Sequence, residues 1–173
     1  MRKYQFAHFL KFRTFSATIL LAALINISGC GFHLQSSYLT PPEFSTLHLT
    51  SQDQYSELTR LVRERLRLNS VTLTDKTNVA ELNLLNDSLS RATLSFYPTG
   101  NVAEYELIYQ VNYTVTPPDG DPKEYKAEIR RDYLDDPRTA LAKSREMELL
   151  TKEMRIQAAD KIVQTLASID VSN

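Results

Sequence analysis

The first 29 residues combine a basic lead with a short apolar run. No acidic side chain precedes Cys30, and the basic ones are Arg2, Lys3, Lys11 and Arg13. Residues 17–27 (ATILLAALINI) are mostly apolar, and Asn26 interrupts the run. A run of about 11 residues is too short to span the bilayer core as a helix, which takes roughly 20. The pattern predicts a secretory signal peptide over residues 1–29, with an uncleaved signal anchor as the alternative.

Residues 44–69 predict a strand followed by a helix. After the polar segment 30–43, which we interpret as a lipidated N-terminus and tether, residues 44–50 alternate apolar and polar positions as in a short strand. Residues 51–53 supply N-cap side chains, and Asn69 is expected to end the helix in a left-handed conformation. Apolar residues recur at helical spacing at Tyr55, Leu58, Leu61, Val62 and Leu66. The opposite face carries Arg60, Arg63, Glu64 and Arg67.

The next segment predicts a long, irregular strand. Within residues 79–96 the apolar positions change phase between Leu84 and Leu85 and change back near Leu94. A regular strand keeps its side chains on constant faces, so this pattern predicts bulges near residues 85–91. The following residues 97–101 (YPTGN) are typical of a hairpin turn.

Residues 103–115 show the most regular alternation in the chain. Seven apolar side chains, from Ala103 to Val115, share one face, while Glu104 and Glu106 lie on the other. This pattern predicts an antiparallel strand that is buried on one side. A second turn at residues 117–120 (PPDG) leads to a strand from Tyr125 to Tyr133, in which Arg131 occupies the apolar phase.

The C-terminal part predicts a long helix. Asp136 is expected to cap it, with Pro137 in the first helical position. Apolar residues at helical spacing follow at Leu141, Met147, Leu150, Met154, Ala158, Ile162 and Leu166. About 30 helical residues measure roughly 45 Å, which is long for a small domain, so a kink near Ser144 would fit.

These elements predict one α+β domain over residues 44–173. Its order is β-α-β-β-β-α, which fits a two-layer sandwich with two helices packed on one face of a four-stranded, mainly antiparallel sheet. The other sheet face is then polar and uncovered. Such a face can be solvated, or it can meet a wet partner surface.

Composition narrows the choice of partner. Removal of residues 1–29 takes away four of the 20 basic side chains and leaves 16 against 21 acidic ones, a net charge near −5. This balance argues against nucleic acid, because binding to DNA or RNA depends on neutralising phosphates. Only three glycines remain after residue 29, too few for a glycine-rich phosphate-binding loop. The single cysteine excludes both a disulfide framework and a cysteine-based metal site.

That cysteine has a specific context. It ends the sequence Ile27-Ser28-Gly29-Cys30, directly after the apolar run. The segment resembles the lipobox of bacterial lipoproteins, in which the thiol accepts a diacylglyceryl group and the new N-terminus is acylated. More than one acyl chain is needed for stable anchoring. The residue after the cysteine is Gly31 rather than the aspartate that marks retention at the inner membrane, so the resemblance implies export to the outer membrane.

No catalytic constellation emerges from the sequence. His48 stands alone on the first predicted strand, without a second histidine or a cysteine to form a zinc site or a Cys–His pair. Glu104 and Glu106 could place two carboxylates together for acid–base work, but an open sheet face is more typical of a solvated surface. Asp135 and Asp136 fit helix capping. We therefore predict a protein that is not an enzyme and needs no cofactor or metal beyond the covalent lipid.

Several segments of the mature chain carry a family resemblance. They are residues 30–34 (CGFHL), 66–69 (LRLN), 100–106 (GNVAEYE), 136–143 (DPRTALAK), 152–154 (KEM) and 158–159 (AA). In their order and spacing they resemble the LptE family of lipopolysaccharide-assembly lipoproteins. The resemblance implies a lipid-anchored outer-membrane protein that plugs and helps to assemble the LptD β-barrel. It also implies binding of lipopolysaccharide on its way to the outer leaflet.

The resemblance also nominates residues that bind lipopolysaccharide, whose anionic groups call for basic contacts. Lys143 occupies the family's basic position, with a solvated helix lysine as the alternative. A second basic residue of the family lies in the hairpin turn, where this chain has Pro98. Arg91 is a candidate substitute. Arg131 matches the family pattern and could instead form a structural ion pair.

A different class of function stays open at this point. A lipid-anchored adaptor or pilotin of another envelope complex, without lipid cargo, would share the anchor and the polar surface. The identity of the protein partner would distinguish the two.

Overall fold

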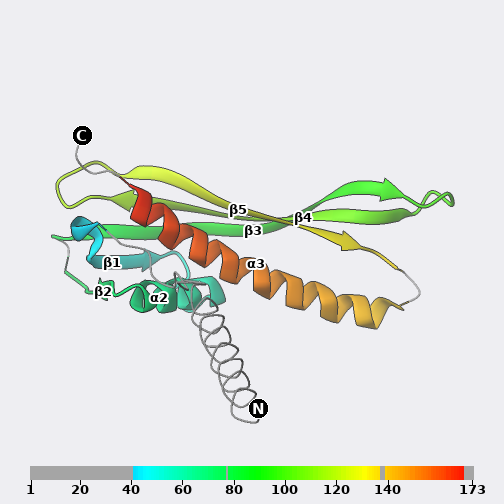
Figure 1. The fold of residues 1–173 in the computed structure, drawn as a ribbon, viewed down its shortest axis with the longest axis horizontal. Helices are drawn as coiled ribbons and strands as arrows, with labels where there is room; N and C mark the ends of the chain where they lie inside the picture. The colour runs from blue at the N-terminus through cyan, green and yellow to red at the C-terminus, as the bar shows by residue number, and fades with distance from the viewer. Residues whose placement is uncertain (1–40, 77, 137–138, 170–173) are drawn as a thin grey trace, which may run out of the picture. The chain divides into compact units, whose positions relative to one another are not determined.

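The computed structural model describes residues 41–76, 78–136 and 139–169. A 3-10 turn, η2 (Pro42–Phe44), leads into β1 (Thr46–Ser51), α2 (Glu57–Leu68) and β2 (Thr72–Leu73), as Figure 1 shows. Three long strands follow, and a long helix ends the described chain: β3 (Ala80–Phe96), β4 (Val102–Thr116), β5 (Lys123–Leu134) and α3 (Ala140–Ser168). The predicted α+β class is confirmed. Each of the two predicted helices is present.

The sheet is mixed and has five strands, in the order β2-β1-β3-β4-β5. The expected count of four was wrong because β2 has only two residues, too few to show an alternating pattern. β1 pairs in parallel with both β2 and β3, whereas β3, β4 and β5 are antiparallel. A parallel pair requires a crossover, and the segment that contains α2 provides it between β1 and β3.

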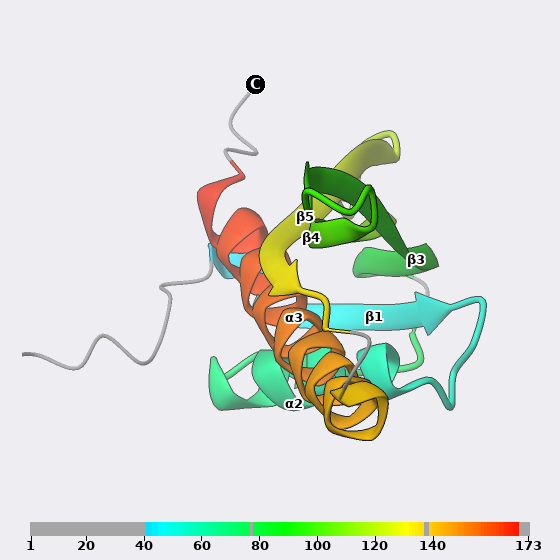
Figure 2. The same ribbon diagram turned by 90° about the vertical axis from the view of Figure 1, so that its right-hand side faces the viewer.

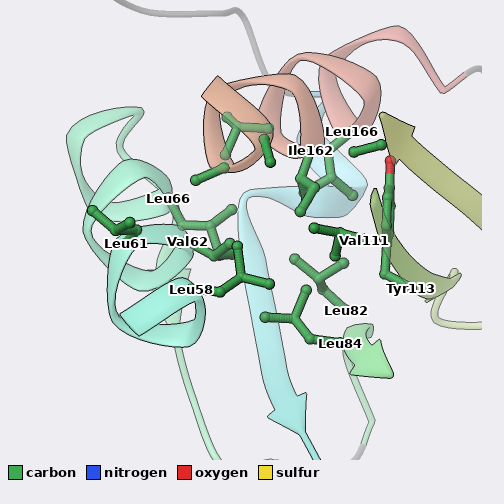
Figure 3. Packing of buried hydrophobic residues seen from close by; sticks show 14 of the residues in the cluster. Leu58, Leu61, Val62, Leu66, Leu82, Leu84, Val111, Tyr113, Ile162 and Leu166 are labelled. Carbon is green, nitrogen blue, oxygen red and sulfur yellow. The ribbon is translucent and has the colours of Figure 1, made fainter. Parts of the chain in front are cut away.

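Both helices cover the same face of the sheet (Figure 2). The core between the two layers is apolar, and Figure 3 shows side chains of α2, β3, β4 and α3 converging there. The labelled residues are Leu58, Leu61, Val62 and Leu66 of α2, Leu82 and Leu84 of β3, Val111 and Tyr113 of β4, and Ile162 and Leu166 of α3. The opposite face of the sheet has no covering element in the described part of the chain.

The irregular phase of β3 has a simple cause. The register shifts between Leu84 and Asn86, so Leu85 is an extra residue, and it shifts again between Thr93 and Ser95. The predicted bulge is therefore confirmed at Leu85, and a further irregularity lies at Leu94. Each shift exchanges the two faces of the strand. Between the two bulges, the odd-numbered residues from Asp87 to Thr93 therefore lie on the helix-covered side.

The boundaries of α2 differ from the prediction. The N-cap is Ser56, whose Oγ accepts a hydrogen bond from the Thr59 N–H at 3.1 Å, rather than one of residues 51–53. Tyr55 lies before the helix and is 97% exposed, so it does not belong to the buried stripe. The left-handed residue after the helix is Ser70, with a φ of 63°, and not Asn69.

The start of α3 was also predicted wrongly. The helix begins at Ala140, with Thr139 at the N-cap position, whereas Asp136 was expected to cap it. The Thr139 N–H donates to the carbonyl oxygen of Asp136 at 3.0 Å, before the helix begins. From Ala140 onward the helix is assigned without interruption to Ser168, past the expected kink at Ser144. None of the described helices is both long and apolar enough to cross a membrane.

A polar network crosses the layers beside the apolar core. The Tyr109 hydroxyl donates to Asp87 on β3, and the Arg155 guanidinium lies 5.9 Å from the Tyr109 ring centroid. Arg155 in turn donates to Glu57 of α2 at 2.7 Å. Burial, followed by the hydrogen bond to Asp87, raises the pKa of Tyr109, so its hydroxyl stays protonated. These contacts link α2 and α3 to the centre of the sheet.

Candidate functional site

Two of the predicted basic residues lie in one row across the sheet. Arg91 of β3 and Arg131 of β5 are both register partners of Leu107 on β4. Directly paired residues share a face. Since Leu107 is 1% exposed and part of the core, this row lies on the helix-covered face. Strand spacing puts the two arginine backbones about 10 Å apart.

The adjacent row supplies two tyrosines. Tyr105 of β4 pairs with Tyr133 of β5, one step closer to the hairpin turn. The Arg91 guanidinium carbon lies 5.0 Å from the Tyr105 ring centroid, a distance at which a cation is attracted to the ring face. The tyrosine therefore helps to hold the arginine over the sheet.

Lys143 of α3 joins the same cluster. Its Nζ lies 5.0 Å from the Tyr133 ring centroid, and the Tyr133 hydroxyl donates to the Lys143 carbonyl oxygen at 3.2 Å. Burial is the main reason why the pKa of Tyr133 is raised; Asp135 adds to this effect, whereas Lys143 and Arg91 oppose it. Lys143 and Arg91 therefore approach the same tyrosine from α3 and β3, and Arg131 lies two residues before that tyrosine on the same face of β5. We call Arg91, Arg131 and Lys143 the cationic cluster.

The three cations differ in how far their charge is neutralised. Lys143 Nζ lies 2.8 Å from Glu146 Oε2, and the lysine side chain is 16% exposed. The hydrogen bond from Lys143 to Glu146 is the main cause that raises the lysine pKa, so the ammonium stays charged at neutral pH. Arg91 and Arg131 are exposed, and neither forms an ion pair with any residue that the structure describes. The two arginines thus present their charge to solvent.

Apolar surface lies close to the cationic cluster. Leu89 precedes Arg91 by two positions on the same sheet face and is 42% exposed. Nearer the hairpin, Leu94 and Phe96 are 51% and 65% exposed. Cations beside exposed apolar side chains form the pattern expected of a surface that contacts an anionic amphiphile.

The hairpin turn carries no charge. Gly100 adopts a φ of 88°, and the Tyr97 N–H donates to the Asn101 carbonyl oxygen at 2.7 Å, which confirms the predicted turn. Arg91 lies at the Leu107 register, well before the turn, so it does not replace a basic residue at Pro98. It lies elsewhere on the sheet.

The other residues weighed from the sequence lie apart from the cationic cluster. His48 pairs in register with Glu81 at the opposite end of β3, and the described residues contain no group of metal-binding side chains. On the open sheet face, Glu106 is bound by Arg130 at 2.8 Å, and Glu104 accepts a hydrogen bond from the Ser95 hydroxyl. Cys30 and the signal peptide lie outside the described residues.

A larger depression lies at the far end of the sheet. It measures about 520 Å³ and is lined by the β4–β5 turn and by Glu43 and Ile169. Asp119 and Asp121 add carboxylates to its rim, against the single cation of Lys123. This acidic lining does not suit an anionic ligand.

Sequence reasoning missed Tyr105, Tyr133 and Glu146 as parts of the site. The tyrosines alternate with polar residues as core positions do, and Tyr133 is indeed buried. Glu146, three residues after Lys143, carried the only usable signal, because side chains at this helical spacing face each other.

Comparison with known proteins identifies the family of this chain. The family model LptE, described as Lipopolysaccharide-assembly, matches residues 44–166. The LPS-assembly lipoprotein LptE of Photorhabdus laumondii is 39% identical over 155 residues, which cover 88% of this chain and 85% of the relative. That of Pectobacterium atrosepticum is 37% identical over 166 residues, covering 94% and 90%.

Solved structures show the same architecture. The crystal structure of rare lipoprotein B from Shewanella oneidensis is 68% identical, with a TM-score of 0.67, and covers 71% of this chain and 94% of that one. A lipoprotein B from Nitrosomonas europaea shares the fold at 21% identity and a TM-score of 0.62, covering 80% of this chain and 91% of that one. The relatives are assembly lipoproteins rather than enzymes, which confirms the non-enzymatic prediction. The chain belongs to the LptE family of lipopolysaccharide-assembly proteins.

Proposed function

We propose that this chain is an outer-membrane lipoprotein that plugs and helps to assemble the LptD β-barrel and binds lipopolysaccharide through the cationic cluster. Membership in the LptE family supports the role in lipopolysaccharide assembly. The observation that carries the binding site is the convergence of Arg91, Arg131 and Lys143 from three elements. Acyl chains on Cys30 hold the protein at the periplasmic side of the outer membrane.

The chemistry of the cluster fits the anionic headgroup of lipopolysaccharide. A guanidinium can donate two parallel hydrogen bonds to a phosphate, and both arginines are free to do so. Their separation of about 10 Å allows one ligand with two anionic groups to contact both. Leu89 beside them offers an apolar contact for an acyl chain.

The uncovered sheet face supports the role as a plug. Its polar side chains bind one another across the strands: Arg130 contacts Glu106 and Glu128, and Lys126 contacts Glu128 at 2.8 Å. Hydrogen bonds from Lys126 and Arg130 lower the pKa of Glu128 to about 2, so this ladder stays ionised at neutral pH. Large barrels enclose a polar, water-filled lumen, and a wet surface of this kind is compatible with it.

The test compares lipopolysaccharide binding by the purified mature chain and by its Arg91→Gln/Arg131→Gln variant. We expect the affinity to fall about ten- to hundredfold, because two charge-assisted hydrogen bonds are lost. Thermal unfolding should be unchanged, since both side chains are exposed. The control variant is Lys123→Gln/Lys152→Gln, which removes the same charge from other exposed positions. Equal affinities of the two variants would exclude the cationic cluster as the binding site.

A second prediction concerns Glu146. Glu146→Gln should raise lipopolysaccharide affinity about two- to fivefold at low salt, because Lys143 loses its intramolecular ion-pair partner and becomes available to the ligand. Glu148→Gln, on the same helix and exposed, is the matched control. Isothermal titration against lipopolysaccharide measures both. A weaker affinity of the Glu146 variant would instead show that Glu146 holds Lys143 in its binding position.

A further inference from the structure

The outward face of α2 is rich in arginine. Arg60, Arg63 and Arg67 are spaced three and four residues apart, so they lie on one side of the helix, away from the buried stripe of Leu58, Leu61, Val62 and Leu66. We call these three residues the arginine face. Lipopolysaccharide binding by the cationic cluster does not use it, because that cluster lies on other elements.

Most of this positive charge is not neutralised within the domain. Glu57 approaches Arg60 only to 4.0 Å, and the same carboxylate binds Arg155 at 2.7 Å. Within the described residues, Arg63 and Arg67 form no ion pair. By contrast, Arg65 of the same helix is paired with Asp160 at 2.9 Å. The arginine that faces α3 therefore has a close ion-pair partner, whereas the outward-facing Arg63 and Arg67 have none among the described residues.

The arginine face borders a shallow depression with one apolar side. The depression measures about 430 Å³, and it is lined by the three arginines together with Glu64 and Leu68. Leu68 is 58% exposed, and Tyr55, just before the helix, is 97% exposed. Arginines with exposed apolar or aromatic neighbours are typical of helices that lie against a lipid headgroup region.

The position of the arginine face relative to the lipid anchor is constrained. The loop after α2 is bonded to the start of the described chain, because the Thr72 N–H donates to the Ser45 carbonyl oxygen at 2.8 Å. The C-terminal end of α2 and η2 thus lie at the same end of the sheet (Figure 1). Residues 31–41 join this end to Cys30, and 11 residues reach at most about 40 Å. An anchor at Cys30 therefore limits the distance between this end of the domain and the leaflet to about 40 Å.

We propose that the arginine face docks on the anionic phospholipid headgroups of the leaflet that holds the Cys30 acyl chains. This proposal rests on the lipid anchor of the proposed function, and not on lipopolysaccharide binding. It places α2 at the periplasmic rim of the barrel. Juxtamembrane basic residues add to the hold of a lipid anchor, and the two signals act together.

The opposite side of the domain has the wrong charge for the same role. Acidic side chains outnumber basic ones on the open face of the sheet, where Glu81, Glu104, Glu106, Glu124, Glu128 and Asp132 surround Lys126 and Arg130. An anionic leaflet repels this face and attracts the arginine face. The charge distribution thus orients the domain as well as holding it.

The test measures vesicle binding by the whole mature chain carrying Cys30→Ala, so that acyl chains do not themselves bring it to the bilayer. Flotation compares vesicles of phosphatidylcholine alone with vesicles that also contain phosphatidylglycerol, at low and at physiological ionic strength. We expect binding only to the anionic vesicles, weakening with salt. Arg60→Gln/Arg63→Gln/Arg67→Gln should lower the partition coefficient about 100-fold at low salt.

The control variant is Lys123→Gln/Arg145→Gln/Lys152→Gln, which changes the net charge equally at exposed positions elsewhere. It should retain most of the vesicle binding. Equal losses in both variants, or equal binding of the parent chain to neutral and anionic vesicles, would overturn the proposal. So would an arginine-face variant that keeps vesicle binding but no longer co-purifies with the barrel, because the face would then bind protein.

Lipopolysaccharide affinity separates this proposal from the function proposed above. The arginine-face variant should bind lipopolysaccharide as the parent chain does, and its thermal unfolding should be unchanged. Loss of lipopolysaccharide binding would assign the arginines to that site and overturn the phospholipid assignment. If the Arg91→Gln/Arg131→Gln variant bound lipopolysaccharide normally, the cationic cluster would be excluded as the binding site. The expected vesicle binding by the arginine face would not change.

Discussion

Replacing Cys30 by alanine is expected to abolish acylation and to move the protein that is not bound to the barrel from the membrane fraction to the soluble periplasmic fraction. Cys30 is the only thiol in the chain, so no other side chain can accept the diacylglyceryl group. Each buried CH₂ of an acyl chain contributes about 0.8 kcal/mol, and the loss of all chains removes this hold completely. Fractionation of cells, with mass spectrometry of the mature N-terminus, measures the effect.

Ser36→Ala provides the matched control, because it changes a small residue of the same segment and leaves the thiol in place. It should stay in the membrane fraction with the acylated mass. An intact leader and an unmodified Cys30 in the native protein would contradict the prediction. The lipid anchor would then have to be removed from the proposed function.

The second large effect concerns the core beneath α3. Leu166→Ala should lower the free energy of unfolding by about 2–5 kcal/mol, because Leu166 is fully buried and its removal leaves a cavity between the helix and the sheet. The midpoint of thermal unfolding should fall by roughly 10 °C. Circular dichroism during heating of the mature chain measures the shift.

Leu149→Ala on the same helix is the control. Leu149 is 62% exposed, so its truncation should change the free energy of unfolding by less than about 0.5 kcal/mol. The pair tests whether α3 is held mainly by its C-terminal half, where the buried residues from Met154 to Leu166 lie. Similar costs for both substitutions would contradict that description of the helix.

Segments with a long, regular pattern were predicted well. In β4, the residues from Leu107 to Val115 alternate between buried and partly exposed, as their apolar and polar side chains indicated. In a strand of this length, one face packs on the core and the other contacts water. The alternation of apolar and polar residues in the sequence therefore matches the alternation of buried and exposed side chains. The phase change in β3 was informative for the same reason, since the extra residue at Leu85 exchanges the two faces.

Short segments and helix ends were predicted poorly. β2 consists of Thr72 and Leu73 and exists only because β1 offers it a parallel partner. Ser51, Asp53 and Ser56 are all acceptable N-cap types, and tertiary contacts choose among them. Ser56 is selected because its hydroxyl bonds to Thr59, which is itself buried and bonded to the Asp53 carbonyl oxygen.

The sequence by itself determined the anchor motif, the α+β class and the identity of the basic candidates, because each of these depends on residues near one another along the chain. Only the tertiary structure decided that Arg91 and Arg131 face each other across Leu107, 40 residues apart, with Lys143 beside them. Strand register sets this arrangement, and register depends on the packing of a whole sheet face against the helices. The same packing buries one side of α2 and leaves its arginines outside.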